Sequence, residues 1–142
     1  MVSGESAIPD PRILVDSSVW IDFLRGTEAT HTALLKERIA EGEPLCLCGL
    51  ILTEVLRGIP DERQFQETRR RFAVLEILPM TQPTFELATD IYRKLRQDGL
   101  SLRNASDTLI AAVALEQSLP LLHNDRDFDL IGLVWPLRFL GT

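Results

Sequence analysis

The 142-residue sequence has few residues of the kinds that hold small secreted proteins together. Its two cysteines, Cys46 and Cys48, are two positions apart, a spacing that rarely meets disulfide geometry, and no histidine lies near them to complete a zinc site. No apolar run approaches the ~18 residues of a membrane span. Residues 1–11 are polar and lack the cationic and apolar segments of a signal peptide. We therefore expect reduced thiols, no membrane association and a cytoplasmic location.

Basic residues are too few to make the chain positively charged. The 15 Lys and Arg residues against 21 Asp and Glu residues give a net charge of −6. This balance opposes non-specific binding to nucleic acid or to anionic membranes. A function on nucleic acid would therefore need a local basic surface, or cations recruited by acidic residues.

The composition is that of one ordinary globular domain. Hydrophobic residues make up 45% and charged residues 25% of the chain, which argues against intrinsic disorder. The length fits a single domain with enough core to fold without disulfides or a structural metal. We assign one domain, 1–142, in which 1–11 is expected to be a flexible N-terminal extension.

Short apolar runs alternate with segments of helical periodicity along the chain. Because the runs lack hairpin turns between them, we expect an α/β fold with a mostly parallel sheet covered on both faces. The expected strands are 12–15, 44–48, 74–78 and 119–122, with an edge strand at 137–140. The expected helices are 19–24, 30–41, 50–57, 61–72, 84–97 and 104–117, and 124–129 is expected to be a polar turn.

Asp16 and Glu54 are acidic residues in otherwise apolar surroundings. Asp16 follows the strand 12–15 directly, where it either caps the next helix or faces the crevice beyond the strand ends. Glu54 lies in a helix that is apolar on nearly every side, and an unpaired carboxylate buried there would be costly. It either pairs with Arg57, three residues on, or faces inward as a metal ligand.

Three more acids lie near the ends of expected elements in the second half of the chain. Asp107 is in the first turn of a helix, on the same face as the apolar Ile110. The helix dipole alone would favour an acid there. Asp125 and Asp127 follow the strand 119–122, where aspartate is also a common turn residue.

All these acids can converge on one edge of a parallel sheet. Carboxylates gathered in a cleft repel one another and cannot all stay ionised without cations. Oxygen ligands of this kind suit Mg²⁺ or Mn²⁺. Such ions activate water and stabilise the leaving oxygen of a phosphodiester, and they would make an acidic cleft attractive to phosphate. The sequence therefore predicts metal-dependent phosphodiester hydrolysis.

Four segments that contain these acids resemble the motifs of PIN-domain ribonucleases. They occur in the family's order, and the resemblance covers nearly the whole chain, from residue 12 to about residue 140, as in the small bacterial VapC toxins of type II toxin–antitoxin modules. The resemblance implies a PIN-like three-layer α/β/α sandwich with four or five strands. The segments are ILVDSSVWI (13–21), TEVLRG (53–58), SDTLIAA (106–112) and NDRDF (124–128).

The resemblance also implies an activity, a metal and partners. It implies an endoribonuclease that depends on Mg²⁺ or Mn²⁺, cuts tRNA or rRNA, forms homodimers and is inhibited by a VapB-type antitoxin. The family's four catalytic and metal-binding acids match Asp16, Glu54, Asp107 and Asp125, and Asp127 matches an auxiliary metal-binding position. The alternative is a catalytically inactive PIN fold that binds RNA or protein.

Three residues match polar positions around these acids. Ser17 matches a hydroxyl residue that helps to order the first acid. Ser106 occupies a position where the family often has asparagine, and His123 one where it often has threonine or serine. His123 is either a loop histidine or a contact to phosphate or metal-bound water. We expect no role for His31.

Two surfaces are candidates for contacts with partners. Basic residues would hold RNA near the cleft, unless they only form solvated helix faces. An apolar groove would accept an amphipathic antitoxin helix that is followed by a basic tail, but the residues that could line it are equally compatible with a core or a dimer interface. The RNA candidates are Arg93, Lys94, Arg96 and Arg103, with Arg69 to Arg71 as a second patch, and the groove candidates are Trp20, Ile21, Phe23 and Leu24.

Overall fold

The computed structural model describes residues 9–141, so most of the expected extension 1–11 lies outside the described residues. Helices and strands alternate through this range. None of its helices combines the length and the apolar character needed to cross a membrane. The elements are β1 (Ile13–Val15), α1 (Ser17–Leu24), α2 (Thr30–Ala40), β2 (Leu45–Cys48), α3 (Gly49–Arg57), α4 (Glu62–Phe72), β3 (Glu76–Leu78), α5 (Gln82–Gln97), α6 (Asp107–Gln117), β4 (Leu121–Leu122) and α7 (Arg126–Gly132).

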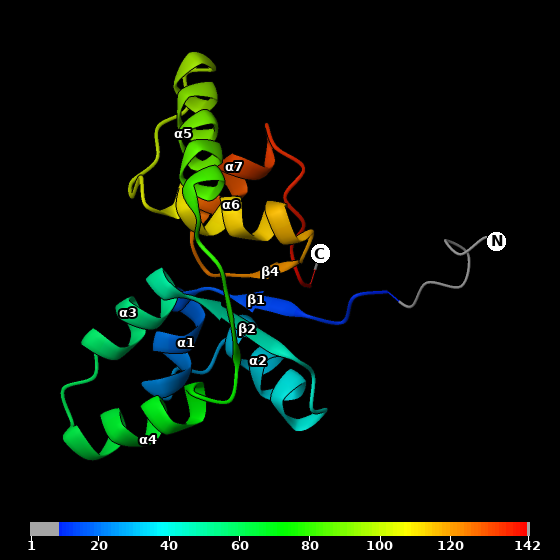
Figure 1. The fold of residues 1–142 in the computed structure, drawn as a ribbon. Coiled ribbons are helices and arrows are strands. Elements are labelled where there is room, and N and C mark those ends of the chain that lie inside the picture. Colours follow the sequence, from blue (N-terminus) through cyan, green and yellow to red (C-terminus); the bar gives the residue numbers. More distant parts are fainter. Residues whose placement is uncertain (1–8, 142) are drawn as a thin grey trace.

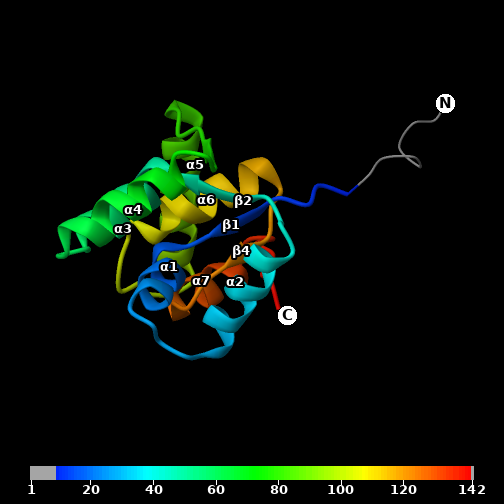
Figure 2. The same cartoon turned by 90° about the horizontal axis from the view of Figure 1, so that it is seen from below.

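The four strands form one sheet in the order β3-β2-β1-β4, and every pairing is parallel. The parallel α/β prediction is thereby confirmed. Seen from below, β1 runs through the middle of the molecule between β2 and β4 (Figure 2). Both central strands are buried along their whole length, and Cys46 and Cys48 of β2 are buried free thiols. Short, wholly apolar strands of this kind are typical of a sheet that is covered on both faces.

Two layers of helices cover the sheet (Figure 1). Helices α5, α6 and α7 lie on one side and α1 to α4 on the other. The Ala-rich α6 is the central helix of its layer, because five consecutive residues from Ile110 to Ala114 are at most 1% exposed. The three layers share one hydrophobic core, which fixes the strand ends relative to the helix starts beside them.

Two expectations about the C-terminal part were wrong. The segment 124–129 is not only a turn, because α7 begins at Arg126 with Asp125 as its N-cap. Phe128 and Ile131, three residues apart, are both fully buried and fasten this helix to the core. The expected edge strand at 137–140 is reduced to a single parallel bridge between Leu121 and Phe139.

Candidate metal centre

Three of the predicted acids lie beyond the carboxyl ends of neighbouring parallel strands. Asp16 follows β1 directly and caps α1 by accepting the backbone N–H of Ser18. Asp125 follows β4 and caps α7 in the same way, through the N–H of Asp127. Glu54 belongs to α3, which begins at the residue after β2. Since β2, β1 and β4 are adjacent and parallel, these residues gather at one edge of the sheet.

The fourth acid, Asp107, is placed by the loop before α6. Asp107 is the first residue of that helix and is 5% exposed. Asp127 is fully buried, and its Oδ1 and Oδ2 accept the backbone N–H groups of Arg103 at 3.1 Å and Asn104 at 2.8 Å. Asp127, which was expected as an auxiliary ligand, thus connects α7 to the loop that leads into α6. These contacts fix the start of α6 and therefore the position of Asp107, its first residue.

The acids are close enough to perturb one another. One carboxylate oxygen from each of Asp107, Asp125 and Asp127 lies within 4.8 Å of the others. Burial, reinforced by the negative charges of Asp125 and Asp16, raises the pKa of Asp107 to about 9. Burial is also the main cause that raises the pKa of Asp16 to about 6, with a smaller contribution from Glu54. The four acids are therefore electrostatic neighbours in the order Glu54, Asp16, Asp107 and Asp125.

Two serine hydroxyls orient the first two acids. The Oγ of Ser17 donates to Glu54 Oε1 at 2.9 Å, and the Oγ of Ser18 donates to Asp16 Oδ2 at 2.5 Å. The hydroxyl that contacts the first acid is thus that of Ser18, whereas the hydroxyl of Ser17, expected in that role, contacts the second acid. The alternative expected for Glu54 was an ion pair with Arg57. Within residues 9–141, Glu54 forms no such ion pair.

The unpaired oxygens of this cluster fit a hard cation. Asp16 Oδ1 and Asp107 Oδ2 are buried and have no hydrogen-bond partner among the described residues. A buried carboxylate oxygen without a partner is costly, and a divalent cation would remove that cost for both acids. The donors are all carboxylate oxygens, which suit Mg²⁺ or Mn²⁺ better than softer metals. The residues present therefore fit the metal expected from the sequence.

Comparison with known proteins identifies the family. The sequence description of the PIN domain matches residues 13–133, which include all the acids of the cluster. The chain belongs to the PIN-domain family. Its relatives include ribonuclease VapC11 of Mycobacterium tuberculosis, 30% identical over 128 residues that cover 89% of this chain and 96% of the relative. Ribonuclease VapC1 of Methanocaldococcus jannaschii is 28% identical over 123 residues, covering 84% of this chain and 81% of the relative.

Solved structures share the fold of this PIN domain. The VapBC2 complex of Rickettsia felis, bound to a DNA fragment from its promoter, matches with a TM-score of 0.70 and 18% identity, covering 90% of this chain and 96% of that chain. FitAcB of Neisseria gonorrhoeae matches with a TM-score of 0.69 and 20% identity, covering 91% and 96%. At these identities the likeness supports the three-layer PIN-like architecture.

Ser106 and His123 make contacts within the loops at the edge of the sheet where Asp16, Glu54, Asp107 and Asp125 gather, which we call the acidic edge of the PIN domain. The Oγ of Ser106 donates to Asn104 Oδ1 at 2.7 Å, just before α6. His123 Nδ1 accepts the N–H of Asp125 at 3.1 Å, and its Nε2 is 3.4 Å from Asp129 Oδ1. Burial lowers the pKa of His123, although Asp129 and Asp125 act in the opposite direction. These contacts place His123 against the backbone of Asp125 and the side chain of Asp129, and its role at the site stays a prediction.

The basic candidates for RNA contact lie on α5, on α4 and beside the acidic edge. Arg93, Lys94 and Arg96 are exposed on α5, where Lys94 is 3.3 Å from Asp98 and the Arg96 guanidinium donates to the Tyr92 hydroxyl at 3.1 Å. Arg103 is exposed in the loop that Asp127 holds, so it is the candidate nearest in sequence to Asp107. Arg69 to Arg71 are exposed on α4, and Arg71 pairs with Glu67 at 2.9 Å.

Proposed function

We propose that this PIN domain is a VapC-type toxin endoribonuclease that hydrolyses phosphodiester bonds of tRNA or rRNA in the cytoplasm. Asp16, Glu54, Asp107 and Asp125 are the proposed ligands of Mg²⁺ or Mn²⁺. The observation that carries the proposal is a pair of buried carboxylate oxygens, one each from Asp16 and Asp107, that have no hydrogen-bond partner within residues 9–141. The relation to VapC11, which is named as a ribonuclease, supports the choice of RNA as substrate.

The residues of the chain prepare this edge for a phosphodiester. The hydroxyls of Ser17 and Ser18 each occupy one oxygen of Glu54 and Asp16, which fixes the orientation of both carboxylates. When bound, the cation supplies the positive charge that attracts phosphate, polarises its oxygens and makes a water molecule more acidic. No side-chain nucleophile is required, because water is the attacking group. We expect products with a 5′-phosphate and a 3′-hydroxyl.

Cleavage assays with isosteric variants test the activity. Total tRNA and ribosomal RNA are incubated with Mg²⁺, with Mn²⁺ or with EDTA, and the new RNA ends are sequenced. We expect cleavage by the wild type with either metal, and none with EDTA, with Asp16→Asn or with Asp107→Asn. Asp90→Asn, which changes an exposed aspartate of α5, is the matched control and should cleave normally. RNA binding without cleavage by the wild type would instead favour the inactive binding module.

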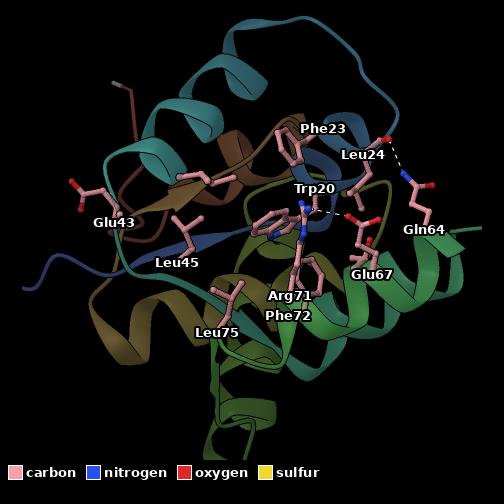
Figure 3. Close-up of a pocket in the computed structure, with 13 residues that line it drawn as sticks. Trp20, Phe23, Leu24, Glu43, Leu45, Gln64, Glu67, Arg71, Phe72 and Leu75 are labelled. Atoms are coloured by element: carbon pink, nitrogen blue, oxygen red, sulfur yellow. Dashed lines mark hydrogen bonds and ion pairs between the residues drawn. The ribbon is translucent and has the colours of Figure 1, made fainter.

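An apolar groove among the helices α1, α2 and α4 supports the proposed antitoxin partner. It lies between α1, the end of α2 and α4 and has a volume of about 440 Å³. Figure 3 shows side chains of Trp20, Leu45, Phe72 and Leu75 around it. The rings of Trp20 and Phe72 meet edge to face at 4.9 Å, and the Trp20 indole N–H is buried without a hydrogen-bond partner in the described part of the chain.

The groove and the acidic edge are connected through α1. Asp16 caps this helix and Trp20 follows one turn later. We propose that an amphipathic helix of a VapB-type antitoxin binds the groove and that the basic tail after it reaches the acids. The groove candidates Trp20, Phe23 and Leu24 line the cavity, whereas Ile21 does not.

Co-purification with the product of the neighbouring reading frame tests the groove. Phe23→Glu places a charge in the groove and should abolish co-purification, because a buried unpaired charge is costly. Leu133→Glu is the matched control, since Leu133 is 74% exposed and does not line this groove. Co-purification of the Phe23 variant at the wild-type level would exclude the groove as the binding site. The expected homodimer is tested separately, by sedimentation of the toxin alone.

A further inference from the structure

Asn124, which directly precedes Asp125, is held by α1 at two points. Its backbone N–H donates to Ser18 Oγ at 3.0 Å, and its side-chain Nδ2 lies 3.4 Å from Asp22 Oδ2 as a longer hydrogen bond. Ser18 and Asp22 are four residues apart on α1 and therefore lie on the same face of that helix. Asn124 is 106 residues from Ser18 in sequence, so these contacts join the first and last acidic segments of the fold.

The hydroxyl of Ser18 serves both segments at once. It accepts the N–H of Asn124 and donates its own proton to Asp16 Oδ2 at 2.5 Å. The backbone N–H of Ser18 donates to the same oxygen at 3.0 Å. Oδ2 of Asp16 is occupied in this way, whereas Oδ1 is buried, has no hydrogen-bond partner among the residues that the structure describes, and is left for a ligand. One side chain thus links the orientation of Asp16 to the position of the loop that carries Asp125.

A third element supports the second contact. His31 of α2 lies with its Nε2 2.7 Å from Asp22 Oδ2, and the two side chains are 14% and 25% exposed. This partly buried contact holds the carboxylate of Asp22 where it can accept from Asn124. Asp22 and His31 are not among the predicted site residues, and the contact between Asp22 and Asn124 connects them to the segment that carries Asp125.

We propose that Ser18 and Asp22 are positioning residues that set the separation between Asp16 and Asp125, and that His31 supports Asp22 from α2. The proposal rests on the proposed metal-dependent function. Mg²⁺ tolerates little departure from octahedral geometry, so a small displacement of one carboxylate weakens its binding. Residues that orient metal ligands in this way typically change metal affinity or activity by about 10- to 100-fold when they are replaced.

Calorimetric titration of the full chain with Mn²⁺ tests the proposal without any RNA. Ser18→Ala should weaken Mn²⁺ binding by about tenfold, and Ser18→Thr, which retains the hydroxyl, should restore it. Asp22→Ala should weaken binding less, because its contact to Asn124 is longer. The double variant should lose less than the product of the two single losses, since both residues act through Asn124. Thr89→Ala removes an exposed hydroxyl that bonds only within α5 and should bind Mn²⁺ like the wild type.

Kinetics separate positioning from a general structural role. With an RNA that the wild type cleaves, Ser18→Ala should lower kcat by about the same factor as Mn²⁺ affinity and leave KM unchanged. Circular dichroism confirms that each variant is folded. Ser18→Ala with wild-type Mn²⁺ affinity, or a Ser18→Thr variant that is folded but not restored, would overturn the positioning role. The proposed function fails by a different result, in which the wild type itself cleaves no RNA. A wild type that cleaves no RNA and also binds no Mn²⁺ overturns both proposals.

Discussion

Asp107 offers a direct test of whether the acidic edge is arranged for a cation. Asp107 is only 5% exposed. This burial, together with the negative charges of Asp125 and Asp16, raises the pKa of its carboxyl from 3.8 to about 9. The folded-state pKa thus lies above the unfolded value. The contribution of Asp107 to the free energy of unfolding therefore has its full value below pH 3.8, and it is lost as the pH rises from there through about 9. At pH 8 and without metal, the carboxyl destabilises the fold relative to a neutral group.

Asp107→Asn removes this destabilisation while keeping the shape of the side chain. A pKa difference of one corresponds to about 1.4 kcal/mol. Asp107 titrates together with its neighbouring carboxyls, so we assign to its own carboxyl a pKa difference of about one to two. Metal-free Asp107→Asn should then unfold with a free energy about 1–3 kcal/mol higher than the wild type at pH 8, or roughly 3–10 °C higher in Tm. At pH 4 the difference should fall below about 0.6 kcal/mol, because the carboxyl is then mostly neutral in the folded chain and partly neutral in the unfolded chain.

Thermal unfolding followed by circular dichroism, in EDTA and in Mn²⁺, measures both parts of this prediction. Mn²⁺ should raise the Tm of the wild type, since it binds the folded state, and should raise that of Asp107→Asn much less. Asp90→Asn on the exposed face of α5 should match the wild type in both conditions. An Asp107→Asn protein that is less stable than the wild type at pH 8 in EDTA would show that the carboxylate stabilises the metal-free fold, and the reasoning would be wrong.

Three further predictions concern residues around the acidic edge. Asp127→Asn should lower the free energy of unfolding by about 2 kcal/mol in urea titrations, because an amide oxygen cannot accept both backbone N–H groups. Asp90→Asn, at an exposed position of α5, should leave it unchanged. Phe128→Ala should cost about 3–5 kcal/mol in the same assay, since the ring is fully buried, and a smaller loss would mean that α7 is dispensable for the core. Arg93→Ala and Arg96→Ala should raise KM for RNA more at low than at high salt, and a KM unchanged at low salt would remove α5 from the RNA surface.

The acidic edge could be predicted largely because its residues contradict their local surroundings. Asp16 ends an apolar strand and Glu54 interrupts an apolar helix, and both contrasts are visible in sequence. The helix α7 was missed because aspartate caps helices and forms turns equally well. Its seven residues contain one apolar pair at helical spacing, Phe128 and Ile131, which is too short a pattern to establish periodicity.

The contacts between distant segments could not be predicted. Ser17 and Ser18 are adjacent hydroxyls at the start of a helix, about 100° apart around its axis, and only the packing of α1 decides which acid each one meets. Asp127 resembles a further ligand in sequence, and the structure adds contacts that the sequence does not reveal, because both of its oxygens accept N–H groups from a loop 23 and 24 residues away. Local patterns identify the acids, but tertiary packing determines which of their oxygens stay free.

The strand order also bears on when activity can arise during synthesis. Asp16 leaves the ribosome early, but β4 must pair with β1 before Asp125 can join it, and the joining contact spans 106 residues. A nascent chain therefore carries only part of the acidic edge until translation has passed β4. A site built on this topology is complete only after most of the polypeptide has emerged, so a binding partner made earlier can meet the chain before its site is complete.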